Sequence, residues 1–301
     1  MITLTVDRGL IRLKSWEDLY ESPGFTRDVD PKAVTLKEII GVYGFESRQP
    51  CGLRTCRQPH GNGYLVATTE GILTNLGSVC GKNNFSVAFT SLKKSFDKEL
   101  AAKERRERLK SLKSRLPGLL SRIERIKTEV APHYSSIRLI AGDVSSDEVP
   151  SSVVDAVRTM RRTNDGVIRS TRRATKQEQQ IAEETGATRP GVPYYVSEIV
   201  GRLANISAIA DSKTLREVLR ELEPALDQLH SAEVDALSEK DAKRIGRLTA
   251  GVDSRLDHLT RIADSVRAFA TRGNLSQLAI LAAPGSEKQS FSKFLTSLSL
   301  A

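Results

Sequence analysis

Residues 51–85 read CGLRTCRQPHGNGYLVATTEGILTNLGSVCGKNNF and hold every cysteine of the 301-residue chain, together with one of its four histidines. The thiols and the imidazole follow the spacing C-x4-C-x3-H-x19-C. Sulfur and imidazole nitrogen are donors that zinc prefers, and four of them fill its tetrahedral shell without leaving a position for a substrate. The spacing therefore predicts one structural zinc ion per chain, with the ligands Cys51, Cys56, His60 and Cys80. The alternative is three buried free thiols beside a surface histidine.

The residues between the last two of these ligands predict a β-hairpin. Residues 64–68 and 72–76 are β-rich, and the residues 69–71 between them are typical of a turn. Such a hairpin would return Cys80 to the other three ligands. A glycine also lies beside three of the ligands, where the backbone has to turn tightly and point amides at sulfur: Gly52, Gly61 and Gly81.

A helix is expected to begin near Thr90, soon after the last ligand. This order of ligand loop, hairpin, Cys-Gly turn and helix, over residues 48–100, resembles the treble-clef group of zinc fingers. The chain departs from that group's usual two ligands before the hairpin and two at the helix, because three ligands precede the hairpin and one follows it. The resemblance implies a small module in which the metal is structural. It ends there, and the other two thirds of the chain resemble no specific family.

The residues around this module predict a mixed α+β domain over residues 1–90, with the zinc module at 51–85. Apolar and polar residues alternate at positions 2–6, which is typical of a strand. Short helices are expected to begin at Ser15 and at Thr35, because each hydroxyl is followed three residues later by a carboxylate. That pair satisfies the free amides at the start of a helix.

The spacing of apolar residues becomes helical after residue 90. One seam repeats at alternating intervals of three and four: Leu109, Leu112, Leu116, Leu119, Ile123, Ile126 and Val130. Such a seam is typical of a helix that packs lengthwise against another helix. Pro117 and Gly118 interrupt it and predict a kink or a break into two helices. The fold class is therefore mainly α, with a small α+β zinc-binding N-terminal domain followed by a helical bundle or coiled-coil region.

Four segments follow the first domain. Residues 91–183 are expected to form a basic helical or coiled-coil segment, although the seven-residue repeat at 153–181 is polar at alternate seam positions. The glycine- and proline-rich residues 184–195 predict a loop between helices. Apolar faces separated by short polar turns predict an antiparallel helical bundle over 196–272. The serine-rich residues 273–301 are expected to be a mobile tail, with or without a short terminal helix.

The same apolar faces do not decide between a monomer and a homo-oligomer. The seam at 109–130 would be buried equally well by a second copy of the chain, which gives a homo-oligomer, or by helices of its own chain. Helices within the chain that could cover the seam are expected after residue 195, and the first of them is expected at 196–206.

The net charge of +9 is concentrated in the middle of the chain. Residues 1–90 carry 10 basic and 9 acidic side chains, residues 91–176 carry 21 and 11, and residues 177–301 carry 15 and 17. The middle is therefore net +10, and such basic stripes attract polyanions. The residues predicted to bind nucleic acid are Arg54, Arg57 and Lys82 beside the metal, and Arg105, Arg106, Arg108, Arg161, Arg162, Arg172 and Arg173 in the basic segment.

Several other classes of protein do not fit the sequence. The first ten residues lack the features of a signal peptide, and no apolar run approaches the ~20 residues that cross a bilayer, so a cytoplasmic protein without a membrane partner is expected. The chain contains no G-x-S-x-G, H-E-x-x-H or glycine-rich dinucleotide motif. These absences favour a protein that is not an enzyme, with an enzyme of unfamiliar type as the alternative.

Two function classes follow from these features. The first is a zinc-containing nucleic-acid-binding protein, regulatory or associated with a mobile element or defence system, whose basic helical segment contacts the phosphate backbone of DNA or RNA. Tyr134 is the only aromatic residue at 97–176, so base stacking on that segment is not expected. The second is a non-enzymatic adaptor or scaffold that binds a protein partner through the zinc module and coiled-coil helices, its basic residues forming a solvated face.

Overall fold

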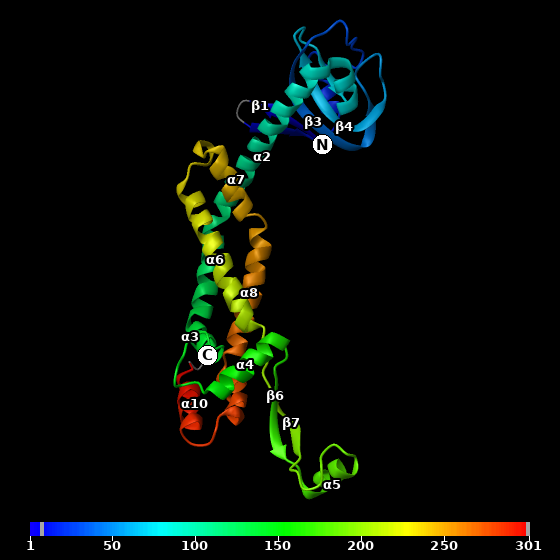
Figure 1. The fold of residues 1–301 in the computed structure, drawn as a ribbon. Coiled ribbons are helices and arrows are strands. Elements are labelled where there is room, and N and C mark those ends of the chain that lie inside the picture. Colours follow the sequence, from blue (N-terminus) through cyan, green and yellow to red (C-terminus); the bar gives the residue numbers. More distant parts are fainter. Residues whose placement is uncertain (7–8, 299–301) are drawn as a thin grey trace. The chain divides into compact units, whose positions relative to one another are not determined.

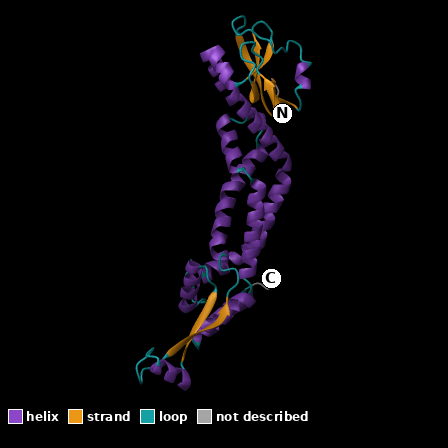
Figure 2. Cartoon of the chain, turned by 90° about the vertical axis from the view of Figure 1, so that its right-hand side faces the viewer, coloured by secondary structure: helices purple, strands orange, loops and turns teal. Residues whose placement is uncertain are grey.

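The computed structural model describes residues 1–6 and 9–298 of the chain (Figure 1). Within them the backbone divides into two compact units. The first comprises Met1–Ser114 and Ala232–Gly246, and the second comprises Arg115–Ser231 and Arg247–Ala301. Helices predominate, and the strands form one five-stranded and one two-stranded antiparallel sheet, which Figure 2 shows in orange. The chain is therefore mainly α with a small antiparallel sheet.

The first unit is built on the five-stranded sheet, whose strand order is β2-β1-β3-β4-β5. The strands are β1 (Ile2–Val6), β2 (Gly9–Leu13), β3 (Leu36–Pro50), β4 (Pro59–Thr68) and β5 (Leu73–Leu76). The strand predicted at residues 2–6 is β1. The predicted hairpin is β4–β5, in which Tyr64 pairs with Leu76 and Ala67 pairs with Leu73. Both predictions are confirmed, and the hairpin carries the chain from the β3–β4 connection to the start of helix α2 (Ser78–Val130).

The short helix α1 (Glu17–Tyr20) is the one that the sequence predicts after Ser15. Ser15 Oγ accepts a 3.5 Å hydrogen bond from the amide of Asp18. The Asp18 carboxylate in turn accepts a 3.4 Å hydrogen bond from the amide of Ser15. These reciprocal contacts satisfy two amides at the start of the helix, which is why so short an element forms here.

The helix predicted after Thr35 is wrong, because these residues form the long strand β3. Burial along β3 alternates at Ile39, Gly41 and Tyr43, which is the period of a strand with one buried face. The strand pairs with β1 on one edge and with β4 on the other. Pairing on two edges outweighs a local capping signal, since a side chain's preference for helix is a weak term beside tertiary packing.

Two apolar clusters pack on opposite faces of the sheet, because successive residues of a strand point to opposite sides. Tyr64 and Val66 of β4 belong to one cluster and Leu65 to the other. Helix α2 covers the first cluster with Phe89 and Phe96. The buried members of that cluster are Val29, Ile39, Cys51, Leu53, Tyr64, Val66, Leu76, Phe89 and Phe96, and those of the second are Ile2, Trp16, Leu19, Tyr43 and Leu65.

Helix α2 begins earlier and continues further than the sequence predicts. It starts at Ser78 rather than near Thr90, and its backbone leaves helical geometry at Ser86, where φ is 47°. A positive φ is uncommon for a residue other than glycine. The chain stays helical through Pro117 and Gly118, so of the predicted kink or break, the break does not occur. The helix thus has a short first segment, which bears Cys80, and a long second one.

A second stretch of chain completes the first unit by pairing its acidic residues with α2. The 3₁₀ helix η2 (Val234–Ala236) and helix α7 (Glu239–Leu248) supply these residues. Asp235 lies 2.7 Å from Lys110, and Glu239 forms an ion pair with Arg105. Part of the basic charge of α2 is therefore balanced within the chain.

The second unit contains a bundle formed by residues 115–130 of α2, α6 (Ala208–Ser231) and α8 (Val252–Phe269), which run side by side in Figures 1 and 2. Arg122 lies 2.6 Å from Asp257 of α8, and Lys127 lies 2.9 Å from Glu223 of α6. The seam residues of α2 in this unit are buried: Leu116, Leu119, Ile123, Ile126 and Val130. The apolar seam is thus covered by helices of the same chain.

Further helices pack at one end of this bundle. They are η1 (Ala131–His133), α3 (Tyr134–Ile140), α4 (Ser151–Thr163), α9 (Arg272–Leu275), η3 (Ser276–Leu281) and α10 (Ser286–Ser297). Helix α10 lies in the segment for which the sequence predicts a mobile tail, with or without a short terminal helix. A helix does form there, and it is packed, because Phe291, Phe294 and Leu295 are buried. Their spacing is that of one apolar helix face. Among the described helices, none combines the length and the apolar character needed to cross a bilayer.

The two-stranded sheet replaces helices that the sequence predicts on both sides of residue 190. Strands β6 (Val167–Arg173) and β7 (Tyr195–Arg202) form an antiparallel ribbon, and helix α5 (Lys176–Glu184) lies between them in the sequence. Helix α4 ends at Asn164 in a left-handed conformation, with φ of 51°. The helix predicted at 196–206 is wrong, because the helical spacing counted Ile199 as a buried residue and it is exposed. The predicted loop joins α5 to β7 rather than one helix to another.

Candidate metal centre and basic surfaces

The three cysteines converge from separate parts of the first unit. Cys51 directly follows β3, Cys56 lies in the connection to β4, and Cys80 lies in the first turns of α2. Their sulfur atoms all lie within 4.8 Å of one another, the only group of potential metal ligands of this kind in the described residues. The Sγ atoms of Cys56 and Cys80 are 2.8 Å apart. Three thiols at this separation are close enough to hold one metal ion.

The environment of the thiols differs from one cysteine to the next. Cys51 is fully buried, whereas Cys56 and Cys80 are half-buried. Burial raises the pKa of Cys51, and burial together with the thiol of Cys56 raises the pKa of Cys80 to about 12. Burial also acts to raise the pKa of Cys56, but hydrogen bonds from Cys80 and the backbone of Gln58 outweigh it and lower that pKa. Cys51 and Cys80 therefore favour the protonated thiol, and binding a metal has to release their protons.

His60, the fourth predicted ligand, is not part of this sulfur group. It lies in β4, where its Nδ1 is 2.7 Å from the hydroxyl of Tyr43. Its Nε2 is buried and has no hydrogen-bond partner among the described residues. Burial lowers the pKa of His60, which favours the neutral imidazole. The structure thus brings three of the four predicted ligands together and leaves the fourth with an unused, buried nitrogen.

Two glycines beside the cysteines are required by close packing. A Cβ added at Gly52 would overlap Oγ1 of Thr74, and one at Gly81 would lie 2.5 Å from the ring of Phe89. Both glycines therefore let the cysteine-bearing segments approach the sheet and the start of α2. The sequence indicates these positions because each glycine directly follows a cysteine.

Alanine substitution should change the stability of the protein in opposite directions at the two glycines of α2. Gly81→Ala forces the ring of Phe89 to move, and overpacking of this kind destabilises by about 1–3 kcal/mol. At Gly118 an added Cβ would meet no described atom within 4 Å beyond its chain neighbours and the nearby backbone of its own helix. Alanine favours helix over glycine by about 1 kcal/mol, so Gly118→Ala should stabilise. Urea denaturation of the two purified variants measures both changes. Equal shifts in the same direction would contradict the packing described for Gly81.

The basic residues predicted beside the metal are mostly paired. Arg54 and Arg57 both contact Asp28, at 3.1 and 2.5 Å. Hydrogen bonds from these two guanidinium groups lower the pKa of Asp28. Lys82 is exposed and forms no ion pair with a described residue. Of this predicted group, only Lys82 has a charge that no carboxylate accompanies.

The basic residues predicted along α2 and α4 also include some that form ion pairs and some that do not. Arg105 pairs with Glu239, and Arg106 lies 3.8 Å from the same carboxylate. Arg161 lies 4.0 Å from Asp143. Arg108 and Arg162 are exposed, and neither forms an ion pair within the described part of the chain.

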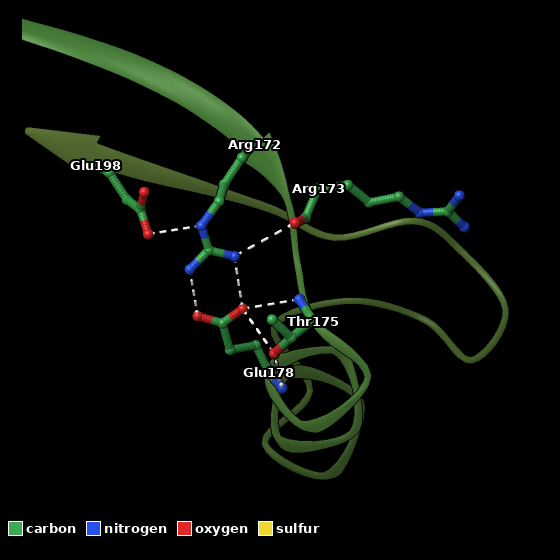
Figure 3. Close-up of polar contacts among 5 residues, drawn as sticks. All are labelled: Arg172, Arg173, Thr175, Glu178 and Glu198. Atoms are coloured by element: carbon green, nitrogen blue, oxygen red, sulfur yellow. Dashed lines mark hydrogen bonds and ion pairs between the residues drawn. The ribbon is translucent and has the colours of Figure 1, made fainter. Parts of the chain in front are cut away.

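Arg172 and Arg173, neighbours at the end of β6, point in different directions (Figure 3). Arg172 donates two 2.8 Å hydrogen bonds to Glu178 and one of 2.6 Å to Glu198. Glu178 also accepts from the amide and the hydroxyl of Thr175, which caps α5. These contacts, with Arg172 first, lower the pKa of Glu178 to about 2. The guanidinium of Arg173 extends away from this group and contacts none of the residues drawn in Figure 3.

Sequence reasoning missed two features of these sites. The hydroxyl of Tyr43 contacts His60, and the side-chain amide of Asn75 lies 3.5 Å from that hydroxyl, but no spacing signal connects these three residues. The β6–β7 ribbon was also missed, although its valines and isoleucines are typical of strands. Comparison with protein-family models, curated proteins and solved structures finds no match to this chain.

Proposed function

We propose that this protein binds nucleic acid through the phosphate backbone and contains a structural zinc ion in its first unit. The metal proposal rests on the three sulfur atoms of Cys51, Cys56 and Cys80, which lie within 4.8 Å of one another. Thiolates are soft ligands, which favours zinc over magnesium or calcium. Cys51 also belongs to the apolar cluster beneath α2, so a bound ion would connect β3 to the core of the unit.

His60 is the candidate for the fourth ligand that tetrahedral zinc requires. Its Nε2 is buried without a partner, and its Nδ1 contacts an oxygen, the hydroxyl of Tyr43. Zinc-binding histidines are commonly oriented in this way by a hydrogen bond on the second ring nitrogen. The neutral imidazole, which its lowered pKa favours, is the form that binds metal. His60 would have to move towards the cysteines, because it lies outside their group.

The nucleic-acid proposal rests on one observation: exposed basic side chains for which the described residues supply no carboxylate. They include Lys82, Arg108, Arg162, Arg169 and Arg173. Each can neutralise a phosphate without first leaving an ion pair. Arg105, Arg106 and Arg172 are weaker candidates, because a phosphate would have to compete with Glu239 or Glu178. This division shifts the proposed contacts from the whole basic segment to its unpaired residues.

Salt dependence of binding tests this proposal. The full chain should bind labelled DNA or RNA, and the logarithm of its affinity should fall with that of the salt concentration by about 0.7–0.9 per neutralised phosphate. Arg108→Gln with Arg162→Gln should flatten the slope by about 1.4–1.8. Arg54→Gln with Arg57→Gln removes the same charge from paired positions and should change it less. Absence of binding to both nucleic acids at low salt would refute the proposal.

A specific observation also favours the adaptor function. Val79 and Val87, which lie before and after Cys80 in the sequence, are 71% and 81% exposed. A protein partner that covered them would bind beside the metal. Such a partner should survive nuclease treatment during purification from cells and should be lost when both valines are replaced by serine. A nucleic-acid-mediated complex would show the opposite response to nuclease.

A further inference from the structure

The two faces of the β6–β7 ribbon differ in composition. In the register of the two strands, Arg169 pairs with Ile199, Thr171 with Ser197, and Arg173 with Tyr195. Alternate residues of paired strands share one face, so these three pairs lie together. We call this the arginine face: Arg169, Thr171, Arg173, Tyr195, Ser197 and Ile199. It contains two arginines and no carboxylate.

The ribbon has one acidic residue, Glu198, which lies on the other face and already binds an arginine. Glu198 pairs with Ser170 in the register, next to Arg172, and it accepts a hydrogen bond from that arginine. Glu178 of α5 holds the same guanidinium from the far side (Figure 3). Arg172 therefore fastens α5 to one face of the ribbon, and it leaves the charge of the arginine face uncompensated.

The arginine face is also the exposed one. All six of its residues are exposed, whereas on the other face Ser170, Arg172 and Val196 are half-buried and Glu198 is exposed. Tyr195 and Ile199 are 58% and 61% exposed. Isolated two-stranded ribbons are marginally stable, yet this one is held at its base, where the amide of Arg202 donates a 2.9 Å hydrogen bond to Gln277 of η3. The fold thus keeps a ribbon in place without covering one of its faces.

We infer that the arginine face lies in the major groove of duplex DNA, an inference that rests on the proposed nucleic-acid function. The major groove of B-form DNA is about 12 Å wide and admits a two-stranded ribbon, whereas that of duplex RNA is too narrow and deep. Arg169 and Arg173 are four residues apart, which is about 13 Å along a strand. The two guanidinium groups therefore reach phosphates or guanine edges at separate places along the groove.

The remaining side chains of this face suit the floor of the groove. Thr171 and Ser197 lie opposite each other at its centre, where a hydroxyl can donate to or accept from a base edge. Tyr195 and Ile199 offer apolar surface, which in the major groove meets the methyl group of thymine. The uncompensated positive charge selects a polyanion over an apolar protein surface.

Fluorescence anisotropy with the full chain and a labelled mixed-sequence duplex of about 30 base pairs, roughly three helical turns, tests the inference. The double variant Arg169→Gln, Arg173→Gln should bind at least about tenfold more weakly, since each contact is worth about 1–3 kcal/mol. The control, Lys288→Gln with Lys293→Gln on the exposed side of α10, removes the same net charge and should lose much less affinity. Equal losses in both variants would show that affinity follows net charge alone and would overturn the inference.

A chemical footprint locates the contact. Dimethyl sulfate methylates guanine N7 in the major groove and adenine N3 in the minor groove. The wild-type chain should protect N7, and the Arg169→Gln, Arg173→Gln variant should not. Protection of N3 alone, or stronger loss of binding to RNA than to duplex DNA in that variant, would contradict a major-groove contact.

If the wild type binds nucleic acid and the ribbon variant binds equally well, the inference fails and the proposed function stands. If the wild type binds no nucleic acid, both fail.

Discussion

Replacing Cys80 by serine should remove zinc from the protein and unfold its first unit. Protein purified without chelator should contain one zinc ion per chain, and the variant close to none. Structural zinc in small modules contributes about 10–16 kcal/mol of apparent binding free energy, which rivals the about 5–15 kcal/mol that stabilises a whole domain. Cys51 lies in the core cluster of this unit, so loss of the ion also loosens the packing beneath α2.

Elemental analysis measures the zinc content, and hydrogen exchange with circular dichroism measures the loss of structure. The sheet of the first unit should lose protection in hydrogen exchange, while α6, α8 and α10 of the second unit keep most of the far-ultraviolet helix signal. Lys82→Ser, two residues further along the same turn and exposed, should keep its zinc and serves as the control. His60→Gln should lower zinc affinity if His60 is the fourth ligand. Wild-type protein with a metal content near zero would reject the site.

Replacing Ile126 by alanine should destabilise the second unit by about 2–5 kcal/mol without changing the mass of the particle in solution. Ile126 is fully buried where α2 packs with α6 and α8, and removing a buried isoleucine side chain costs this much when the neighbours cannot close the cavity. Leu120→Ala, at a half-buried position on the same helix, should lose less. Thermal or urea unfolding measures the difference, and two transitions are expected for two units.

The mass of the particle in solution shows whether the apolar seam of α2 is buried within one chain or between two. Arg122 and Lys127 already pair with carboxylates of α8 and α6, so the seam between them has partners inside the chain. Sedimentation at several concentrations should therefore give the mass of one chain for wild type and variant alike. A dimer that dissociates when Ile126 becomes alanine would instead favour the homo-oligomer that the sequence leaves open.

The sequence predicted those elements whose signal lies in their own residues. The β4–β5 hairpin was predictable because a turn with Gly71 separates two β-rich segments, and the cysteine cluster because three rare residues share one window. Strand β3 was not, since Thr35 and Glu38 imitate a helix cap and only pairing with β1 and β4 decides the outcome. Local patterns thus reveal an element's type where no distant segment competes for it.

The sequence indicated which side chains could bind the metal, but it did not indicate how they are placed relative to one another. Spacing indicated His60 as a fourth ligand, but the position of its ring depends on Tyr43, which comes from another strand. The basic residues show the same limit. Arg105 and Arg108 are alike in the sequence, and only the distant Glu239 distinguishes a paired charge from an unpaired one. A run of charges identifies a surface, whereas its partners depend on the fold.

The division of the first unit between two stretches of chain has a consequence for its synthesis. The residues 115–231 that separate them all belong to the second unit. At about 5–20 residues per second, a ribosome needs on the order of 10 s to translate them. During that interval residues 78–114 of α2 have been made, but Asp235 and Glu239 do not yet exist. A nascent chain therefore carries Lys110 and Arg105 unneutralised, and the first unit reaches its final form only after translation has passed residue 246.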